Sequence, residues 1–468
     1  MSNTTGAPHI ALFPSAGMGH LTPFLRIAAA LLSRGCTVTL ITAKPTVSAA
    51  ESSHIASFLS RHPQVKHVDF HTIPLQHSTP TTDDPFFLQF NAISRSVHLL
   101  RPLLSCLSSP PLSAIFADFA AASNMTSLAS ELGVPTYIVS TSSVKFLCLA
   151  AHLPELVTDP TKLNISSSEV NVPGLTPLPL SSLPPPFLVP NHLFTSTIAT
   201  NSRALSRAKG IIVNSFDWFE PENLEAINSG RVLDSLPPVL PIGPLETICE
   251  ENNEKEKEKE KYMSWLDSQA MESVVYVSFG SRTAMSRDQI RELSEGLERS
   301  GHRFLWVLKT SKVDREDKQE LRDLLGEPFL ERTKDKGLVV KSWVRQQEIL
   351  GHPAVGAFVN HCGWNSVTEA ARWGVPVVAW PQHGDQKLNA EVVERAGLGT
   401  WERSWGWGGQ ELVSGDAIGT KIREAMEDEK MRKMARKVGE EAKKAVGVGG
   451  TSEKVLKQVL EYLKQKSD

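Results

Sequence analysis

Residues 9–42 read HIALFPSAGMGHLTPFLRIAAALLSRGCTVTLIT, and this stretch decides the fold class. Its first five residues form an apolar run that enters a turn with two glycines. Apolar side chains then recur with helical spacing over residues 21–33, Gly35 stands where a helix would end, and residues 37–42 are rich in β-branched side chains. The pattern predicts a strand, a helix and a second strand. This is the repeating unit of a parallel sheet with helices on both faces.

The same alternation continues along the whole chain. In the first half it predicts strands at residues 112–118, 135–140 and 211–214 and a helix at residues 124–132. In the second half it predicts strands at residues 274–279, 304–308, 338–340, 356–360 and 375–380, a helix from a capping box at residue 286 to residue 301, and three helical patterns within residues 416–466. Because 468 residues exceed what one core usually serves, we expect two doubly wound α/β domains. Such sheets bind ligands beyond the carboxyl ends of their strands, so we expect the two Rossmann-like domains to face a central cleft.

A change in composition marks the expected domain boundary. Residues 250–261 read EENNEKEKEKEK, a mixed-charge run that offers no apolar face and that we interpret as part of an exposed linker. The expected organisation is an N-terminal domain at 1–248, a linker at 249–262, a C-terminal domain at 263–445, and a last helix at 446–468 that packs back on the N-terminal domain. Residues 173–190, rich in proline and leucine, are expected to form a loop near a ligand site.

The bulk composition excludes several classes of protein. Hydrophobic residues make up 41% and charged residues 22%, which is typical of a globular chain. A net charge of −3 gives no reason to expect nucleic acid or an anionic membrane as a partner. The five cysteines are scattered without a C-x-x-C pair, which argues against a zinc cluster and favours a reducing compartment. No segment resembles a signal peptide or a membrane span, so we expect a cytoplasmic protein, and a monomer.

A second informative segment lies at residues 343–386, which contain HCGWNS at positions 361–366 and close on PQHGDQ. The strand predicted before His361 leads into a tight turn, and Asn365 or Ser366 is expected to cap the following helix. A helix N-terminus with unpaired N–H groups, a histidine and a serine is a site for an anionic diphosphate.

Two further side chains of this segment suit a nucleotide. Glu369 falls about one turn into the helix, where its carboxylate can accept both hydroxyls of a ribose. Trp343 offers a flat face on which a uracil can stack. The sequence therefore predicts a site for a uridine diphosphate.

The 44-residue segment resembles, over its full length, the signature of the plant secondary-product glycosyltransferases. The shared points are the opening tryptophan, Gln346, the HCGWNS core, Glu369 and the closing P-x-x-x-D-Q. The rest of the chain is also similar to that family of inverting UDP-sugar transferases with the GT-B fold. The signature usually has proline before the glutamine, and Arg345 stands there in this chain. We expect little consequence, because the neighbouring contact is made by the backbone.

The resemblance implies a role for each residue of the donor site. Trp343 would stack on uracil, the backbone of Val344 would pair with its edge, and Gln346 and Glu369 would hold the ribose. The diphosphate and the sugar would be contacted by Gly19, Thr141, Ser281, His361, Trp364, Asn365, Ser366, Asp385 and Gln386. Glutamine at the last position accompanies glucose in this family, so the expected donor is UDP-glucose.

A base is predicted in the first half of the chain. His20 stands where the first helix begins, and Asp118 ends a strand of the same predicted sheet, so the carboxylate can reach the imidazole. A carboxylate that fixes the tautomer and stabilises the imidazolium makes a histidine a general base. The family uses a histidine and an aspartate at the matching positions in these roles.

The expected reaction is a single displacement at the anomeric carbon, which inverts its configuration. Helix N–H groups and His361 would neutralise the departing UDP, so neither a metal nor another cofactor is expected. The apolar and aromatic character of several segments suits a flat phenolic acceptor such as a flavonoid. The residues expected to line its site are Phe86, Phe90, Phe119, Phe146 and Phe187.

The linkage formed is a separate question. The start SAGMGHLTPF at residues 15–24 and the stretch DDPFFLQFNAI at residues 83–93 resemble the flavonoid C-glycosyltransferase branch of the family. This resemblance implies a carbon–carbon bond to a phloroglucinol-type ring. Two alternatives stay open at this point: a flavonoid O-glucosyltransferase, and a UDP-sugar-binding protein or epimerase without transferase activity.

Overall fold

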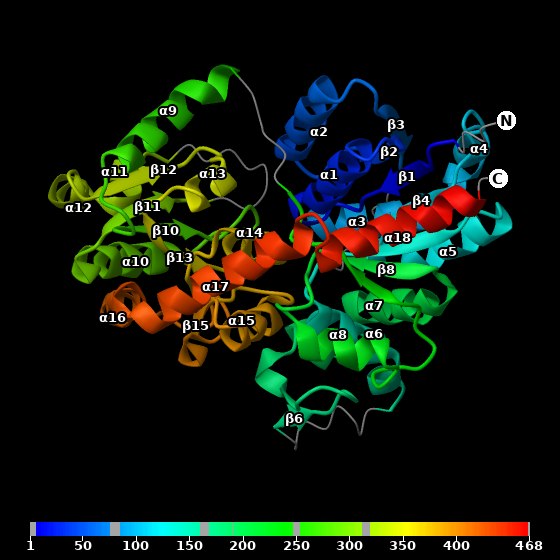
Figure 1. Ribbon diagram of the computed structural model, residues 1–468. Coiled ribbons are helices and arrows are strands. Elements are labelled where there is room, and N and C mark those ends of the chain that lie inside the picture. The colour runs from blue at the N-terminus through cyan, green and yellow to red at the C-terminus, as the bar shows by residue number, and fades with distance from the viewer. Residues whose placement is uncertain are drawn as a thin grey trace. The chain divides into compact units, whose positions relative to one another are not determined.

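The structure of the chain is a computed structural model that describes residues 6–74, 85–159, 168–189, 191–246, 253–310 and 319–466. Contacts divide the chain into two compact units. The first unit comprises Met1–Ile248 and Lys444–Asp468, and the second comprises Cys249–Lys443. Each unit is built around one parallel sheet with helices against it, which confirms the expected α/β class with two Rossmann-like domains (Figure 1).

The sheet of the first unit has seven strands in the order β3-β2-β1-β4-β5-β8-β9, and all neighbours are parallel. Its strands are β1 His9–Phe13, β2 Thr37–Lys44, β3 Lys66–His71, β4 Ala114–Asp118, β5 Thr136–Ser140, β8 Gly210–Val213 and β9 Val239–Pro241. The strand order reverses at β1, which has β2 on one side and β4 on the other. The loops after β1 and β4 therefore leave the sheet side by side, at the type of position where such folds bind ligands.

The helices of the first unit follow these strands in turn. They are α1 Met18–Leu32, α2 Ala49–Arg61, α3 Pro85–Ser96, α4 Leu100–Ser105, α5 Ala122–Glu131, α6 Val144–Thr158, α7 Leu193–Ala204, α8 Pro221–Asn228 and, from the end of the chain, α18 Thr451–Lys466. Short 3₁₀ turns lie at η1 Val97–Leu99, η2 Phe119–Ala121, η4 Leu180–Ser182, η5 Pro185–Leu188 and η6 Leu205–Arg207. The predicted proline-rich loop contains only η4, η5 and β7 Leu178–Pro179, which pairs with β6 Glu169–Val170.

The sheet of the second unit has six parallel strands in the order β12-β11-β10-β13-β14-β15. They are β10 Val274–Ser278, β11 Arg303–Val307, β12 Gly337–Val340, β13 Val355–Asn360, β14 Val377–Ala379 and β15 Gly399–Trp401. The helices are α9 Asn253–Asp267, α10 Arg287–Ser300, α11 Leu321–Leu325, α12 Glu327–Thr333, α13 Gln346–Leu350, α14 Trp364–Trp373, α15 Gln386–Arg395, α16 Gly415–Glu427 and α17 Glu429–Val446, with a 3₁₀ turn η7 at Arg403–Trp405. The three C-terminal helices α16, α17 and α18 confirm the three predicted patterns.

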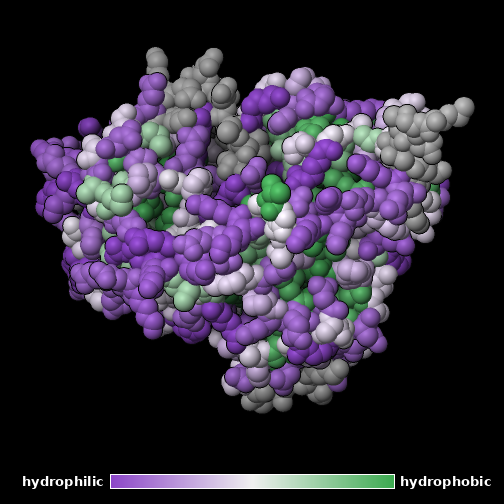
Figure 2. Space-filling view, in the orientation of Figure 1, coloured by the Kyte–Doolittle hydropathy of each residue, from purple (hydrophilic) through white to green (hydrophobic). Residues whose placement is uncertain are grey.

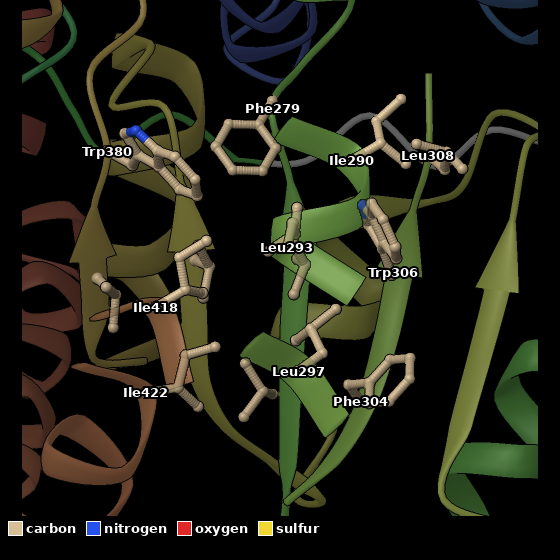
Figure 3. Packing of buried hydrophobic residues seen from close by; sticks show 14 of the residues in the cluster. Phe279, Ile290, Leu293, Leu297, Phe304, Trp306, Leu308, Trp380, Ile418 and Ile422 are labelled. Carbon is tan, nitrogen blue, oxygen red and sulfur yellow. The ribbon is translucent and has the colours of Figure 1, made fainter. Parts of the chain in front are cut away.

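Helix α10 shows how local sequence sets an element of this core. Ser286 caps its start by accepting the backbone N–H of Gln289 at 3.2 Å, and Gly301 ends it with a φ of 74°. Its apolar stripe packs with α16 against β10 and β11, as Figure 3 shows. The stripe and its partners are Ile290, Leu293, Leu297, Phe304, Trp306, Ile418 and Ile422.

From residue 253 onward, the segment expected to be an exposed charged linker (residues 249–262) is helical. Asn253–Asp267 is the helix α9, and the helix belongs to the second unit. Its C-terminal half supplies an apolar face that the charged repeat lacks: Tyr262 is 2% exposed and Leu266 is fully buried. Packing of these two side chains explains why the helix joins the unit rather than standing apart from it.

The visible surface is mainly hydrophilic, with hydrophobic side chains in small separate groups (Figure 2). Among the described helices, none is both long enough and apolar enough to cross a lipid bilayer.

Candidate active site

A histidine and an aspartate meet at the carboxyl edge of the first sheet. His20 lies in the first turn of α1, and Asp118 is the last residue of the neighbouring strand β4. His20 Nδ1 lies 2.8 Å from Asp118 Oδ2. The backbone N–H of Ala120 donates to the other carboxylate oxygen, Oδ1, at 2.8 Å. The structure thus brings together the two side chains that the sequence predicts to pair, and their catalytic role stays a prediction at this point.

This contact fixes the chemistry of the imidazole. Asp118 accepts the Nδ1–H, which places the lone pair of the neutral ring on Nε2. The side chain of His20 is 24% exposed whereas that of Asp118 is fully buried. The pair therefore consists of a buried carboxylate that orients the ring and an imidazole that a ligand can reach.

Thr141 and Gly19 lie beside this pair. Thr141 follows β5, the next strand along the sheet, and its Oγ1 lies 3.3 Å from His20 Nδ1. Gly19 precedes His20 in α1 and is exposed. Both residues predicted as donor contacts in this half of the chain are therefore next to the histidine.

Aromatic rings gather where α3, α6, α7 and η5 meet. The ring centroids of Phe146 and Phe187 are 6.4 Å apart, and those of Phe187 and Phe194 are 5.8 Å apart. Phe87 meets Phe194 edge-on at 5.6 Å. Phe187 is 2% exposed and holds the centre of the cluster, while Phe146 is half-buried.

The remaining predicted acceptor residues differ from one another in burial and in position. Phe119 is half-buried and directly follows Asp118, so it lies at the histidine–aspartate pair. Phe90 is 8% exposed and belongs to the core under α3. The side chain of Phe86 and residues 83–84 lie outside the described part of the chain. Phe87 and Phe194 are additions from the structure: the sequence segment that contains Phe87 was identified, but no local pattern indicates that it meets α7.

In the second unit, three adjacent strands lead to residues that are predicted to contact the diphosphate or the sugar. Strands β10, β13 and β14 are neighbours, and Ser281, His361 and Asp385 follow them. The imidazole of His361 packs between two glycines. A Cβ added at Gly280 or Gly363 would lie 2.7 or 2.5 Å from its ring atoms, and Gly280 also has a φ of 73°.

Burial makes His361 a neutral hydrogen-bonding group. Burial lowers the pKa of His361 to about 3, and the charge of the nearby His383 acts in the same direction. At neutral pH the ring therefore carries no positive charge in this structure. We therefore expect His361 to meet a diphosphate by donating a hydrogen bond through a ring N–H.

The helix after His361 starts earlier than the sequence predicts. Helix α14 begins at Trp364 with Gly363 as its N-cap, so the expected cap by Asn365 or Ser366 is wrong. The reason lies in the turn: Cys362 has a φ of 62°, and its N–H donates to Asn360 Oδ1 at 2.6 Å. Because of this turn, the helix starts before both of the predicted cap residues. Asn365 and Ser366 instead lie in the first turn, among backbone N–H groups that face the helix start.

A hydrogen-bond network joins the predicted ribose and phosphate contacts. Gln346 Nε2 donates to Glu369 Oε2 at 2.7 Å and to Ser366 Oγ at 2.9 Å. Tyr276, buried on β10, donates to Gln346 Oε1 at 3.2 Å. The network holds α13 against α14. The sequence analysis missed Tyr276, because its contact joins residues 70 positions apart and no local pattern indicates it.

The predicted uracil contacts lie on the loop before α13. Trp343 is half-buried, and Lys309 Nζ lies 5.2 Å from its ring centroid. Val344 is 7% exposed, so its backbone rather than its side chain is what a base edge could meet. Trp364 is 3% exposed and packs into the unit.

The last two residues of the segment are tied to their surroundings. Asp385 Oδ2 accepts a hydrogen bond from Asn389 Nδ2 at 2.9 Å, and the same amide donates to the carbonyl of Cys362 at 2.9 Å. Gln386 Oε1 accepts the backbone N–H groups of Gln382 and His383 at 2.8 and 3.0 Å. Asn389, missed by the sequence analysis, thus links the loops after β13 and β14.

Among the described residues, no group of three or more His, Cys, Asp or Glu side chains is arranged to hold a metal ion. The groups found are a carboxylate-backed imidazole at the edge of one Rossmann-like sheet and, at the edge of the other, a helix start with a neutral histidine and a serine. Both groups stand beyond the carboxyl ends of parallel strands, where Rossmann-like sheets bind ligands.

Comparison with known proteins defines the family. Residues 192–405 match the family described as UDP-glucoronosyl and UDP-glucosyl transferase. UDP-glycosyltransferase 708C1 of Fagopyrum esculentum is 50% identical over 99% of this chain and 97% of its own length. UDP-glycosyltransferase CGT of Oryza sativa subsp. indica is 48% identical over 96% of this chain and 94% of its own. The crystal structure of LpCGTa in complex with UDP superposes with a TM-score of 0.85 at 44% identity, covering 98% of this chain and 99% of that one. The chain belongs to the UDP-glycosyltransferase family.

Proposed function

We propose that this enzyme transfers glucose from UDP-glucose to a phenolic, flavonoid-type acceptor, with inversion at the anomeric carbon, and that the new bond is made to a carbon of a phloroglucinol-type ring. The observation that carries the proposal is the 2.8 Å contact between His20 Nδ1 and Asp118 Oδ2 beside an exposed edge of the imidazole. A protein that only binds UDP-sugar does not need a base backed by a buried carboxylate.

In the proposed mechanism, His20 takes a proton from an acceptor hydroxyl through Nε2. Asp118 holds the ring in that tautomer and stabilises the imidazolium that forms. The acceptor then attacks the anomeric carbon in line with the departing UDP. One displacement inverts the centre, so an α-linked donor gives a β-linked product.

The donor groups of the second unit supply binding and stabilisation of the leaving group. Gln346 and Glu369 would take the ribose, while the first turn of α14, with Ser366 and neutral His361, would take the diphosphate. Backbone N–H groups and neutral donors can stabilise a leaving UDP without a divalent ion. We infer that transfer is independent of metal, and activity that is lost on treatment with a chelator and restored by a divalent cation would contradict this.

The glucose preference rests on Gln386. Its amide anchors the turn at residues 382–383, so the side chain shapes the end of the donor segment. A competition assay with several UDP-sugars tests the preference. UDP-glucose is expected to be consumed first, and preferential use of UDP-galactose or UDP-glucuronate would overturn this part of the proposal.

The acceptor class rests on the aromatic cluster. The rings of Phe146 and Phe187 stack on each other, Phe119 directly follows Asp118, and such rings favour a flat aromatic ligand.

The same base can serve formation of a carbon–carbon bond, after which the attacked ring carbon loses its proton, the phenolate oxygen regains one and the ring is aromatic again. Removal of a phenolic proton spreads negative charge onto the ring carbons ortho and para to the oxygen, and further hydroxyls on the ring reinforce it. Which atom attacks depends on which one is held about 3–3.5 Å from the anomeric carbon. Support for carbon comes from the stretches at residues 15–24 and 83–93 and from relatives named CGT.

One experiment separates the alternatives. The enzyme is incubated with UDP-glucose and a trihydroxylated phenolic acceptor, and the product is heated in acid and treated with β-glucosidase. A C-glucoside survives both treatments and fragments within its sugar ring in mass spectrometry. Release of glucose and aglycone would show an O-glucosyltransferase, and absence of any product across a phenolic panel would favour a binding protein.

A further inference from the structure

Arg345 forms the middle of a tight turn in the donor segment. The backbone N–H of Gln346 donates to the carbonyl of Val344 at 3.0 Å, and Arg345 has a φ of −80° and a ψ of 78°. These are the features of an inverse γ-turn. Proline, which usually stands at this place in the signature, would favour the turn through its ring, because the ring fixes φ near −65°. Arginine has no such constraint, so other groups must hold the turn.

Two contacts of Arg345 do so. Its backbone N–H donates to Tyr262 Oη at 3.1 Å, and its guanidinium lies 3.2 Å from Glu348 Oε1. Tyr262 comes from α9, is 2% exposed, and belongs to the same unit as the turn. The first of these bonds is possible only because residue 345 is not proline, which has no N–H.

We propose that Tyr262 is a positioning residue for the nucleotide, and that its hydroxyl replaces the proline ring in holding the turn that presents Val344 and Gln346. The inference rests on the proposed donor site. The residues on either side of Arg345 are those expected to meet the base and the ribose, and Gln346 is hydrogen-bonded to Glu369 at 2.7 Å. A turn that is free to shift would misplace both contacts, since outer groups that orient ligating residues affect affinity.

The geometry makes Tyr262 and Arg345 a matched pair. In a proline, the ring carbon Cδ takes the place of the amide hydrogen. With Tyr262 Oη only 3.1 Å from the nitrogen, that carbon would be pressed against the oxygen. A phenylalanine at position 262 has no oxygen there. We therefore expect a proline at position 345 to be tolerated better with phenylalanine than with tyrosine at position 262, while the natural arginine fits the tyrosine.

The test is calorimetric titration of the full-length protein with UDP, for the wild type, Tyr262→Phe, Arg345→Pro and the double variant. Tyr262→Phe is expected to bind UDP about three- to tenfold more weakly, the loss of one neutral hydrogen bond. Arg345→Pro is expected to lose more, and the double variant to recover affinity relative to Arg345→Pro. The KM for the acceptor should not change in Tyr262→Phe.

Two controls separate positioning from general damage. Leu266→Ala removes a fully buried apolar side chain of α9 that cannot hydrogen-bond to the turn, so it should lower the unfolding temperature while UDP affinity stays near that of the wild type. Arg345→Ala keeps the N–H and should bind UDP more tightly than Arg345→Pro. Wild-type UDP affinity in Tyr262→Phe, or a double variant no better than Arg345→Pro, would overturn the inference. Failure of the wild type to bind UDP would instead refute the proposed donor site.

Discussion

A histidine that acts as a base needs one ring nitrogen for the group that orients it and the other for its substrate. His20 meets this requirement because Asp118 engages Nδ1, and Asp118 is itself held by the N–H of Ala120. The carboxylate therefore cannot swing away from the ring without losing a second bond.

For His20→Ala we expect transfer to fall by a factor on the order of 10²–10⁴, the contribution of a general base. UDP affinity should stay nearly unchanged, because the proposed uridine contacts belong to the second unit. Initial rates with a phenolic acceptor and calorimetry with UDP check both statements. Activity within about tenfold of the wild type would rule out the general-base role.

Loss of Glu369 should affect the two donor-site ligands alike, because the ribose that it is proposed to contact is present in both UDP and UDP-glucose. Glu369→Ala is expected to weaken the binding of both ligands by about 1.5–3 kcal/mol, or roughly 10- to 100-fold. It also removes one of the two acceptors of Gln346 Nε2, so the network at α13 loosens. Calorimetry with each ligand tests this, and unchanged UDP affinity would remove Glu369 from the donor site.

The low pKa of His361 predicts a dependence of stability on pH. In the unfolded chain this group titrates near 6.5, whereas in the folded protein it stays neutral down to about 3. Below pH 6.5 the unfolded state binds a proton that the folded state does not. The contribution of His361 is therefore fully present above pH 6.5 and is lost as the pH falls toward 3.

The comparison that isolates this group is wild type against His361→Gln without ligand. Between pH 8 and pH 5 the wild type should lose about 2 kcal/mol more unfolding free energy than the variant, since each pKa unit corresponds to about 1.4 kcal/mol. Chemical denaturation across this pH range measures the difference. A difference that is constant with pH would show that the histidine is not kept neutral by burial.

At the scale of elements, a buried carboxylate sets the position of α6. Glu220 accepts the backbone N–H groups of Val144 and Lys145 at 3.1 and 3.0 Å, together with the Ser215 hydroxyl at 2.7 Å. Burial raises the pKa of Glu220, and these hydrogen bonds oppose the rise. The helix start that it holds lies three residues after Thr141, so Glu220 links the segment after β8 to the contact with His20.

Glu220→Gln leaves one backbone N–H facing an amide donor, and we expect a loss of about 1–3 kcal/mol of stability. Because the start of α6 shifts, the KM for the acceptor should rise while UDP affinity is kept. Glu51→Gln, at a buried carboxylate in the first turn of α2, is the matched control. It should cost stability without changing the KM. Equal effects of both variants on the acceptor would contradict the link to Thr141.

Elements that local sequence patterns specify could be predicted from the sequence alone. The strand–helix–strand unit at residues 9–42 and the capped helix α10 follow from local patterns, and parallel strand ends brought His20 to Asp118. The edge strand β3 was missed because only Phe70 is buried in it, so it shows no apolar run. The start of α14 depends on the positive φ of Cys362, which a non-glycine residue rarely adopts. Contacts such as that of Asn389 depend on which loops are neighbours, and no local pattern encodes this.

On the scale of the whole molecule, the C-terminal helix is part of the unit that the N-terminal residues form. Helix α18 belongs to the first unit although residues 249–443 separate it from the rest of that unit. Ser452 Oγ donates to the carbonyl of Gly243 at 2.7 Å, and the helix contacts β9. Its apolar face is buried through Leu456, Val459, Leu460 and Leu463.

The stability of the first unit should therefore depend on the last residues of the chain, while UDP binding should not. Leu463, fully buried, is expected to cost about 2–5 kcal/mol when changed to alanine. For a unit of this size that corresponds to roughly 4–9 °C in the unfolding transition of the first unit. Lys457→Ala, at a side chain 64% exposed on the same helix, should leave the transition within about 2 °C. Calorimetric unfolding of both variants, combined with UDP titration, checks the prediction. If Leu463→Ala also weakened UDP binding, the assignment of the proposed uridine contacts to the second unit would fail.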